Sequence, residues 1–149
     1  MRRAGVEDAA DLARLLHDFN TEFDEPTPGV ETLTRRVEKL LAEGEVTALL
    51  AGEGPDGIAQ LRTFPSIWTD GLEAYLAELY VVPARRGEGI GRALLEASMY
   101  TARAAGATRI DLNTSETDVA ARALYESAGF TNREGSEDGP RMLYYEREL

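Results

Sequence analysis

The feature that most constrains the fold is a glycine-rich segment, PARRGEGIGR, at residues 83–92. It follows the alternating run LEAYLAELYVV (72–82), which predicts a strand that stops at Pro83, and it opens directly into a helix predicted from Gly89 to Ala105. A second strand-like run, TRIDLNTS (108–115), comes next. A strand, a helix and a strand in this order form a βαβ unit, so the two strands should be parallel.

The other elements complete one mixed sheet. Apolar residues at helical spacing predict helices from Glu7 to Phe23 and from Val30 to Ala42, and a short helix over 118–129. The runs 46–51 and 57–64 are separated by turn formers and should pair as a hairpin. We also expect a short strand at RRAGV (2–6) and two antiparallel C-terminal strands, FTNRE (130–134) and RMLYYEREL (141–149). The fold class is therefore α+β, or mixed α/β, with one domain over residues 1–149.

Composition excludes several kinds of chemistry. The chain has no cysteine and one histidine, which rules out thiol nucleophiles, disulfides and Cys/His zinc clusters, and no metal site is expected. A formal net charge of -11 argues against binding nucleic acid through its phosphates and is compatible with a cationic partner. No apolar run approaches the roughly 18 residues of a membrane span, and no signal peptide is visible, so we expect a soluble, cytoplasmic protein.

The glycine-rich segment has the chemistry of an anion site. A loop that runs from a strand into a helix offers unpaired N–H groups and the positive end of the helix dipole, which suit phosphate oxygens. Glycines at 87, 89 and 91 permit close approach of a ligand. A Walker loop would need a lysine after Gly91, and the dinucleotide fingerprint would need a glycine where Arg92 stands. The first is excluded, and the signal for the second is weak.

The arrangement Arg86-x-x-Gly89-x-Gly91, between LYVVP and RALLEA, resembles motif A of the GNAT superfamily of N-acetyltransferases, and ALYESAGF (123–130) resembles its motif B. The resemblance covers residues 72–130. It implies a mostly antiparallel sheet with a central parallel pair and helices on both faces, and acetyl-CoA as cosubstrate with its pyrophosphate on the loop. The cofactor-binding residues that it implies are Leu79, Tyr80, Val81, Val82, Arg86, Gly87, Glu88, Gly89, Ile90, Gly91, Arg92, Asn113, Asp118 and Tyr125.

Two side chains are candidates for the proton transfers of acetyl transfer. The helical pattern alone favours Tyr125 as a tyrosine at the core edge with its hydroxyl in water, whereas the resemblance implies that it is the acid that protonates the coenzyme A thiolate. Glu78 lies among apolar strand residues, on the face of Leu76 and Tyr80 by simple alternation. Burial would raise its pKa and suit it to accept a proton from the incoming ammonium, although anchoring a cationic substrate stays an open alternative. Relatives often carry asparagine where this chain has Asp118. An aspartate can cap the helix equally well, but it has no amide N–H to donate, so its contact with the cofactor is in doubt.

The acceptor is less constrained. By position in the family, Phe64, Trp68 and Tyr75 could line its pocket, although Trp68 could instead pack against the sheet or a second subunit. The acidic balance favours a small cationic primary amine, with a protein amine left open, and homodimers are common in the family. Because no cysteine can form an acyl-enzyme, we predict direct transfer in a ternary complex. A non-catalytic acyl-CoA sensor or partner module is the main alternative function, and a nucleotide-binding protein of another fold is a third.

Overall fold

The computed structural model describes all residues, Met1–Leu149. The chain divides into two compact units, Met1–Leu112 and Asn113–Leu149. The prediction of one domain stays a prediction, and we describe each unit by itself. None of the helices has the length and apolar character needed to cross a membrane.

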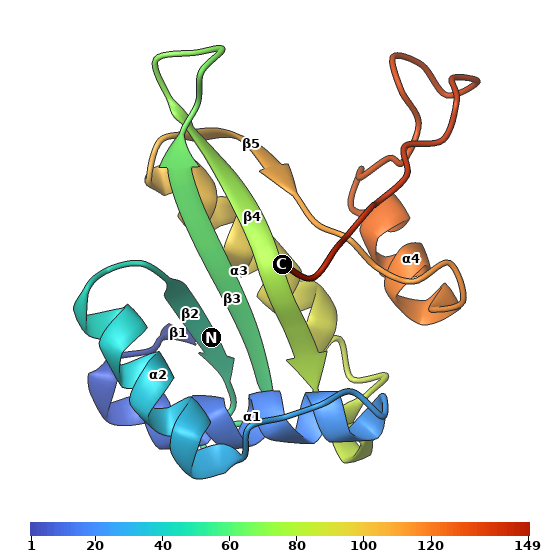
Figure 1. Ribbon diagram of the computed structural model, residues 1–149. Coiled ribbons are helices and arrows are strands. Elements are labelled where there is room, and N and C mark those ends of the chain that lie inside the picture. Colours follow the sequence, from blue (N-terminus) through green and yellow to red (C-terminus); the bar gives the residue numbers. More distant parts are fainter. The chain divides into compact units, whose positions relative to one another are not determined.

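The first unit is a five-stranded mixed sheet with helices on both faces (Figure 1). Its strands lie in the order β1-β2-β3-β4-β5, with antiparallel pairs throughout except for the parallel pair of β4 and β5. The fold class, the hairpin and the parallel pair are thus confirmed. The bounds are β1 (Arg2–Arg3), η1 (Val6–Asp8), α1 (Ala9–Glu22), α2 (Val30–Ala42), β2 (Thr47–Ala51), β3 (Gly57–Pro65), β4 (Leu72–Val81), η2 (Pro83–Arg85), α3 (Ile90–Ala104) and β5 (Ala107–Asp111).

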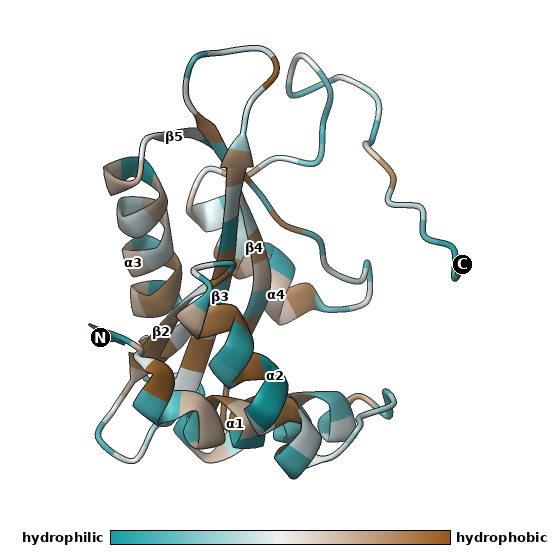
Figure 2. Cartoon of the chain, turned by 60° about the vertical axis from the view of Figure 1, so that its left-hand side comes forward, coloured by the Kyte–Doolittle hydropathy of each residue, from teal (hydrophilic) through white to brown (hydrophobic).

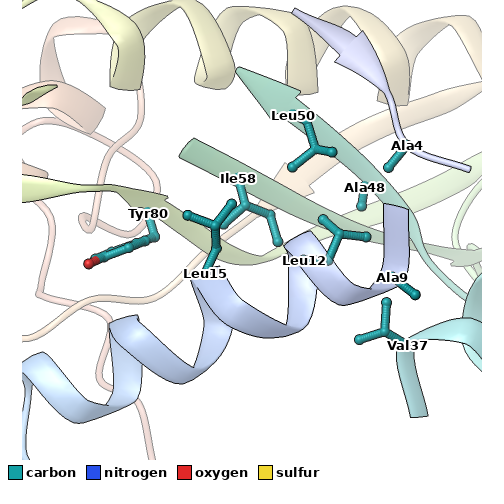
Figure 3. Packing of buried hydrophobic residues seen from close by; sticks show 9 residues of the cluster. All are labelled: Ala4, Ala9, Leu12, Leu15, Val37, Ala48, Leu50, Ile58 and Tyr80. Atoms are coloured by element: carbon teal, nitrogen blue, oxygen red, sulfur yellow. The ribbon is translucent and has the colours of Figure 1, made fainter. Parts of the chain in front are cut away.

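Neighbouring residues on β3 show how the two faces are covered. Ile58 belongs to the core formed with α1 and α2, which buries residues from five elements and the segment after β1: Ala4, Ala9, Leu12, Leu15, Val37, Ala48, Leu50, Ile58 and Tyr80 (Figure 3). The preceding residue, Gly57, faces the other way, because a Cβ there would lie 3.0 Å from Leu94 of α3. Hydrophobic stretches occur in the strands and in the helices, and α2 also carries broad hydrophilic stretches (Figure 2).

The helix α3 is buried along a stripe that differs from the one hydropathy predicts. We expect Ile90, Leu94, Ala97 and Thr101 to share the inner stripe, but the buried residues are Leu94, Leu95, Ser98 and Ala102. Ser98 can lie in the core because its hydroxyl donates to the carbonyl of Leu94 at 2.8 Å, which satisfies the polar group within the helix.

A β-bulge changes the expected orientation of β4. Gln60 of β3 pairs with Glu78, but the next residue, Leu61, pairs with Leu76, so Ala77 is an extra residue on β4. Glu78 and Tyr80 therefore share a face, and Leu76 lies on the opposite one. The prediction that Leu76 shares the face of Glu78 is wrong, because simple alternation does not hold across a bulge.

The second unit contains α4 (Val119–Ser127) and a long C-terminal segment. The two strands predicted over 130–134 and 141–149 do not form, and this part of the prediction is wrong: the segments share only one antiparallel bridge, between Arg133 and Arg141. Alternation in LYYEREL specifies two faces but supplies no partner edge, and Leu143, Tyr144 and Tyr145 are exposed. The pair of β4 and β5 consequently lies at the end of the sheet and not at its centre.

Candidate active site

The glycine loop offers a row of unpaired backbone donors. The amide N–H groups of residues 87 to 91 have no acceptor within the protein, and no side chain caps α3. Gly87 and Gly89 both have φ of 82°, a left-handed conformation in which other residues are strained. Their glycine requirement is conformational, because a Cβ at either position would meet no atom within 4 Å. The loop thus fits the anion cradle that the sequence predicts.

The arginines of this loop are engaged with carboxylates. Arg85 donates to Asp56 at 2.7 Å and to Glu88 at 2.9 Å, and its guanidinium lowers the pKa of Glu88. Arg86 forms two hydrogen bonds of 2.7 Å with the carboxylate of Glu22 at the end of α1. Sequence reasoning missed Asp56 and Glu22, because neither lies in a motif and both are remote from the loop along the chain.

One edge of β4 is open beside the loop. Pairing with β5 stops at Tyr75, which lies opposite Asp111, while β4 continues to Val81. The Val82 amide donates to the backbone carbonyl of Asp56 at 2.9 Å on the β3 side, so by antiparallel alternation the backbone groups of Leu79 and Val81 point toward the open edge. The Val81 carbonyl accepts a hydrogen bond from Arg86 Nε at 2.9 Å. The remaining groups on this edge could pair with an extended ligand as an added strand would.

Glu78 lies on β4 along the open edge, on the face where α1 packs farther along the strand. It is half-buried, and burial raises the pKa of its carboxyl, an effect that the nearby charge of Arg62 partly opposes. The register places Gln60 opposite Glu78 and Arg62 opposite Tyr75, all on the same face. A carboxylate whose pKa is raised by desolvation is a stronger base than an ordinary glutamate, which suits it to accept a proton.

The proposed acceptor residues are only partly brought together. Tyr75 of β4 lies on the same face of the sheet as Glu78, on the far side of the bulge. Phe64 of β3 also lies on this face, two residues beyond Arg62, the partner of Tyr75. Trp68 lies farther away, in the loop between β3 and β4, and is 87% exposed. The hydroxyl of Ser66 holds this loop by donating to Glu73 at 2.7 Å and accepting from the Trp68 amide at 3.1 Å. Trp68 does not pack against the sheet, so this alternative for it is wrong.

In the second unit, Asp118 and Tyr125 lie at the two ends of α4. Asp118 caps the helix, as predicted, by accepting from the Ala121 amide at 3.0 Å. Gly129, with φ of 89°, ends it, and the Phe130 amide returns to the Tyr125 carbonyl at 3.0 Å. Burial raises the pKa of Tyr125 to about 12, and the charge of Asp118 adds to the rise. The phenol is therefore protonated at neutral pH and can donate. Asn113 is exposed at the start of this unit.

Known proteins share both this sequence pattern and this fold. The sequence profile described as Acetyltransferase (GNAT) family matches residues 10–130. The chain belongs to this family. The GNAT resemblance predicted from the two motifs is thereby confirmed, and so are the enzyme class, N-acetyltransferase, and the mixed α/β fold with one parallel strand pair.

Relatives of this GNAT protein include acetyltransferases for different acceptors. The aminoglycoside N(6')-acetyltransferase type 1 of Stenotrophomonas maltophilia is 31% identical over 100% of this chain and 93% of its own. The mycothiol acetyltransferase of Beutenbergia cavernae is 32% identical over 88% of this chain, which spans only 44% of that relative. A crystal structure of an acetyltransferase from Arthrobacter sp. FB24 superposes with a TM-score of 0.90 at 49% identity, covering 99% of this chain and 94% of that one.

Proposed function

We propose that this GNAT protein transfers the acetyl group of acetyl-CoA to a primary amine of a small cationic molecule. The observation that carries the proposal is the row of unpaired amides at residues 87 to 91 beside the open edge of β4. Together they offer donors for a pyrophosphate and an edge for the pantetheine arm. The formal charge of -11 favours a cationic acceptor, and one relative is an aminoglycoside acetyltransferase.

The residues of the chain would divide the work as follows. Residues 87 to 92 bind the pyrophosphate, with the amides of 87 to 91 as the principal donors, and Arg86, which the resemblance also assigns to the cofactor, stands at the start of this segment. Leu79 and Val81 hold the arm through their backbone, and the predicted contacts of Tyr80, Val82, Asn113 and Asp118 stay predictions. Phe64, Trp68 and Tyr75 are proposed to contact the acceptor, although Trp68 lies far along the hairpin from Glu78.

The transfer needs two proton movements. Glu78, whose pKa is raised by burial, would take a proton from the acceptor ammonium or anchor that cation. The free amine then attacks the thioester carbonyl, the new C–N bond forms, and the C–S bond breaks. Tyr125, protonated at neutral pH, would give its proton to the departing thiolate. No cysteine is available to carry the acetyl group, so the transfer is direct, in a ternary complex.

An amine panel tests the proposal. Purified protein is given acetyl-CoA with an aminoglycoside, a polyamine, an amino-sugar or a peptide with a free N-terminus, and release of the coenzyme A thiol is followed. We expect amine-dependent release that is fastest for a polycation and slow for a neutral amine of similar size. Binding of acetyl-CoA without release by any amine would overturn the enzyme proposal and favour the sensor module. Release with the peptide alone would contradict a small-molecule acceptor.

A further inference from the structure

A pair of side chains joins the end of α1 to the start of the glycine loop. Glu22 is the last residue of α1, and Arg86 directly precedes Gly87. The two terminal nitrogens of the guanidinium, Nη1 and Nη2, each donate a hydrogen bond of 2.7 Å to one oxygen of the Glu22 carboxylate. Such a bidentate pair fixes orientation as well as distance, because both groups are planar.

The pair rests on a buried aromatic platform. The guanidinium carbon of Arg86 lies 5.6 Å from the centre of the Tyr80 ring, and burial first, then the nearby Glu22 carboxylate, raises the pKa of the Tyr80 phenol. The helix α1 contributes to this platform, since Phe19 stacks on Tyr80 with ring centres 5.1 Å apart. Tyr80 is only 5% exposed. The platform therefore holds the pair at a fixed place relative to β4 and α1.

The contacts of Arg86 suit a positioning role better than that of a phosphate ligand. Its Nε donates to the Val81 carbonyl at 2.9 Å, so all three guanidinium nitrogens are engaged by protein groups. The pair is also partly exposed, with 44% of the Arg86 side chain and 28% of the Glu22 side chain accessible. Exposed ion pairs add little to stability, so the pair contributes mainly geometry.

We propose that Glu22 and Arg86 act as a clamp that holds the glycine loop in its binding conformation, and that Arg86 is a positioning residue. The inference rests on the proposed function, because the loop is the proposed pyrophosphate site. Binding of acetyl-CoA at residues 87 to 91 then depends on Glu22, a residue of a different element. Without the clamp, the negative charge of Glu22 would have no effect on the affinity for an anionic ligand or would lower it.

The test compares four variants by titration calorimetry with acetyl-CoA. E22Q and R86K each remove the bidentate geometry, and R86K keeps the positive charge. The double variant E22Q/R86K measures whether the two changes act through one contact. E31Q is the matched control, because Glu31 forms an exposed ion pair with Arg35 in α2, away from the loop, and loses the same charge.

The clamp predicts that E22Q and R86K each weaken acetyl-CoA binding on the order of 5- to 10-fold, that the double variant is no weaker than either, and that E31Q matches wild type. The KM for acetyl-CoA should rise in E22Q while kcat and the melting temperature change little. A direct phosphate ligand predicts the reverse: E22Q binds as well as wild type or better, and R86K keeps its affinity. That result overturns the clamp and leaves the proposed function intact, whereas a wild type that does not bind acetyl-CoA overturns both.

Discussion

Hydrogen bonds from Arg2 and Gly5 to the carboxylate of Asp8 hold the start of α1. Asp8 immediately precedes this helix and is 7% exposed. Its carboxylate accepts hydrogen bonds from Arg2 Nη1 and Nη2 at 2.7 and 2.6 Å, and a third from the Gly5 amide at 2.8 Å. We expect Asp8→Asn to destabilise the first unit, because asparagine keeps the size and one acceptor but loses the charge that both Arg2 and the amide stabilise.

The magnitude follows from the pKa of Asp8. The hydrogen bonds from Arg2 first, and then from Gly5, lower that pKa from 3.8 to about 2. The difference between 3.8 and about 2 corresponds to roughly 2.4 kcal/mol in the free energy of unfolding at neutral pH. The Arg2 side chain is 52% exposed, so water screens part of the interaction, and we expect about 1 to 2 kcal/mol.

The pH dependence has a definite sign. Because the folded-state pKa is lowered, the stabilisation is fully present above the unfolded pKa near 3.8 and is lost as the pH falls through about 2. Urea unfolding of wild type and Asp8→Asn at pH 7, 5 and 3 should therefore give a difference that is constant from pH 7 to 5 and about half as large at pH 3. Glu31→Gln, in an exposed pair, should show almost no difference. A difference that stays constant down to pH 3 would refute the charge-based reasoning.

Three further predictions concern the site. Tyr125→Phe should lower kcat on the order of 10² to 10⁴ fold while the affinity for acetyl-CoA stays largely intact, and steady-state turnover at the wild-type rate would remove Tyr125 as the acid. The wild-type kcat/KM should fall toward low pH through a pKa above the ordinary 4.5 of a glutamate, because the base must be ionised; Glu78→Gln should lose this acidic limb, and a limb that persists excludes Glu78. Gly89 and Gly44 have φ of 82° and 72°, so alanine at either position should lower the free energy of unfolding by about 1 to 2 kcal/mol. Only Gly89→Ala should also weaken acetyl-CoA binding, with Gly44→Ala as the control. Equal affinities of the two variants for acetyl-CoA would contradict the role of the loop as an anion cradle.

Helices, hairpins and the glycine loop could be predicted because the residues that specify each of them lie close together along the chain. The helix over 30–42 has its expected bounds, and the turn formers between β2 and β3 specify the hairpin. The glycine loop could be placed for the same reason, since one strand, one loop and one helix follow each other along the chain. Asp118 could be assigned to the helix cap from its position alone.

Features that depend on distant partners could not be predicted in this way. The bulge at Ala77 leaves no mark in the alternation of β4, yet it decides that Glu78 shares a face with Tyr80 and not with Leu76. Glu22 meets Arg86 only because the fold brings the end of α1 to the loop. The C-terminal run LYYEREL has the alternation of a strand but lacks a partner edge, which no pattern within the run can reveal.

The pairing of the loop arginines changes how anion binding at this loop is explained. The sequence presents Arg85, Arg86 and Arg92 as a basic exception in an acidic chain, which suggests attraction by charge. In the structure, Asp56 and Glu88 balance Arg85, and Glu22 balances Arg86, so much of that charge is compensated. What the loop offers a pyrophosphate is then mainly the set of directed amides at 87 to 91, supported by the dipole of α3. Amides bind only when the backbone holds them in place, which explains why both left-handed glycines and a clamp on Arg86 belong to the same site.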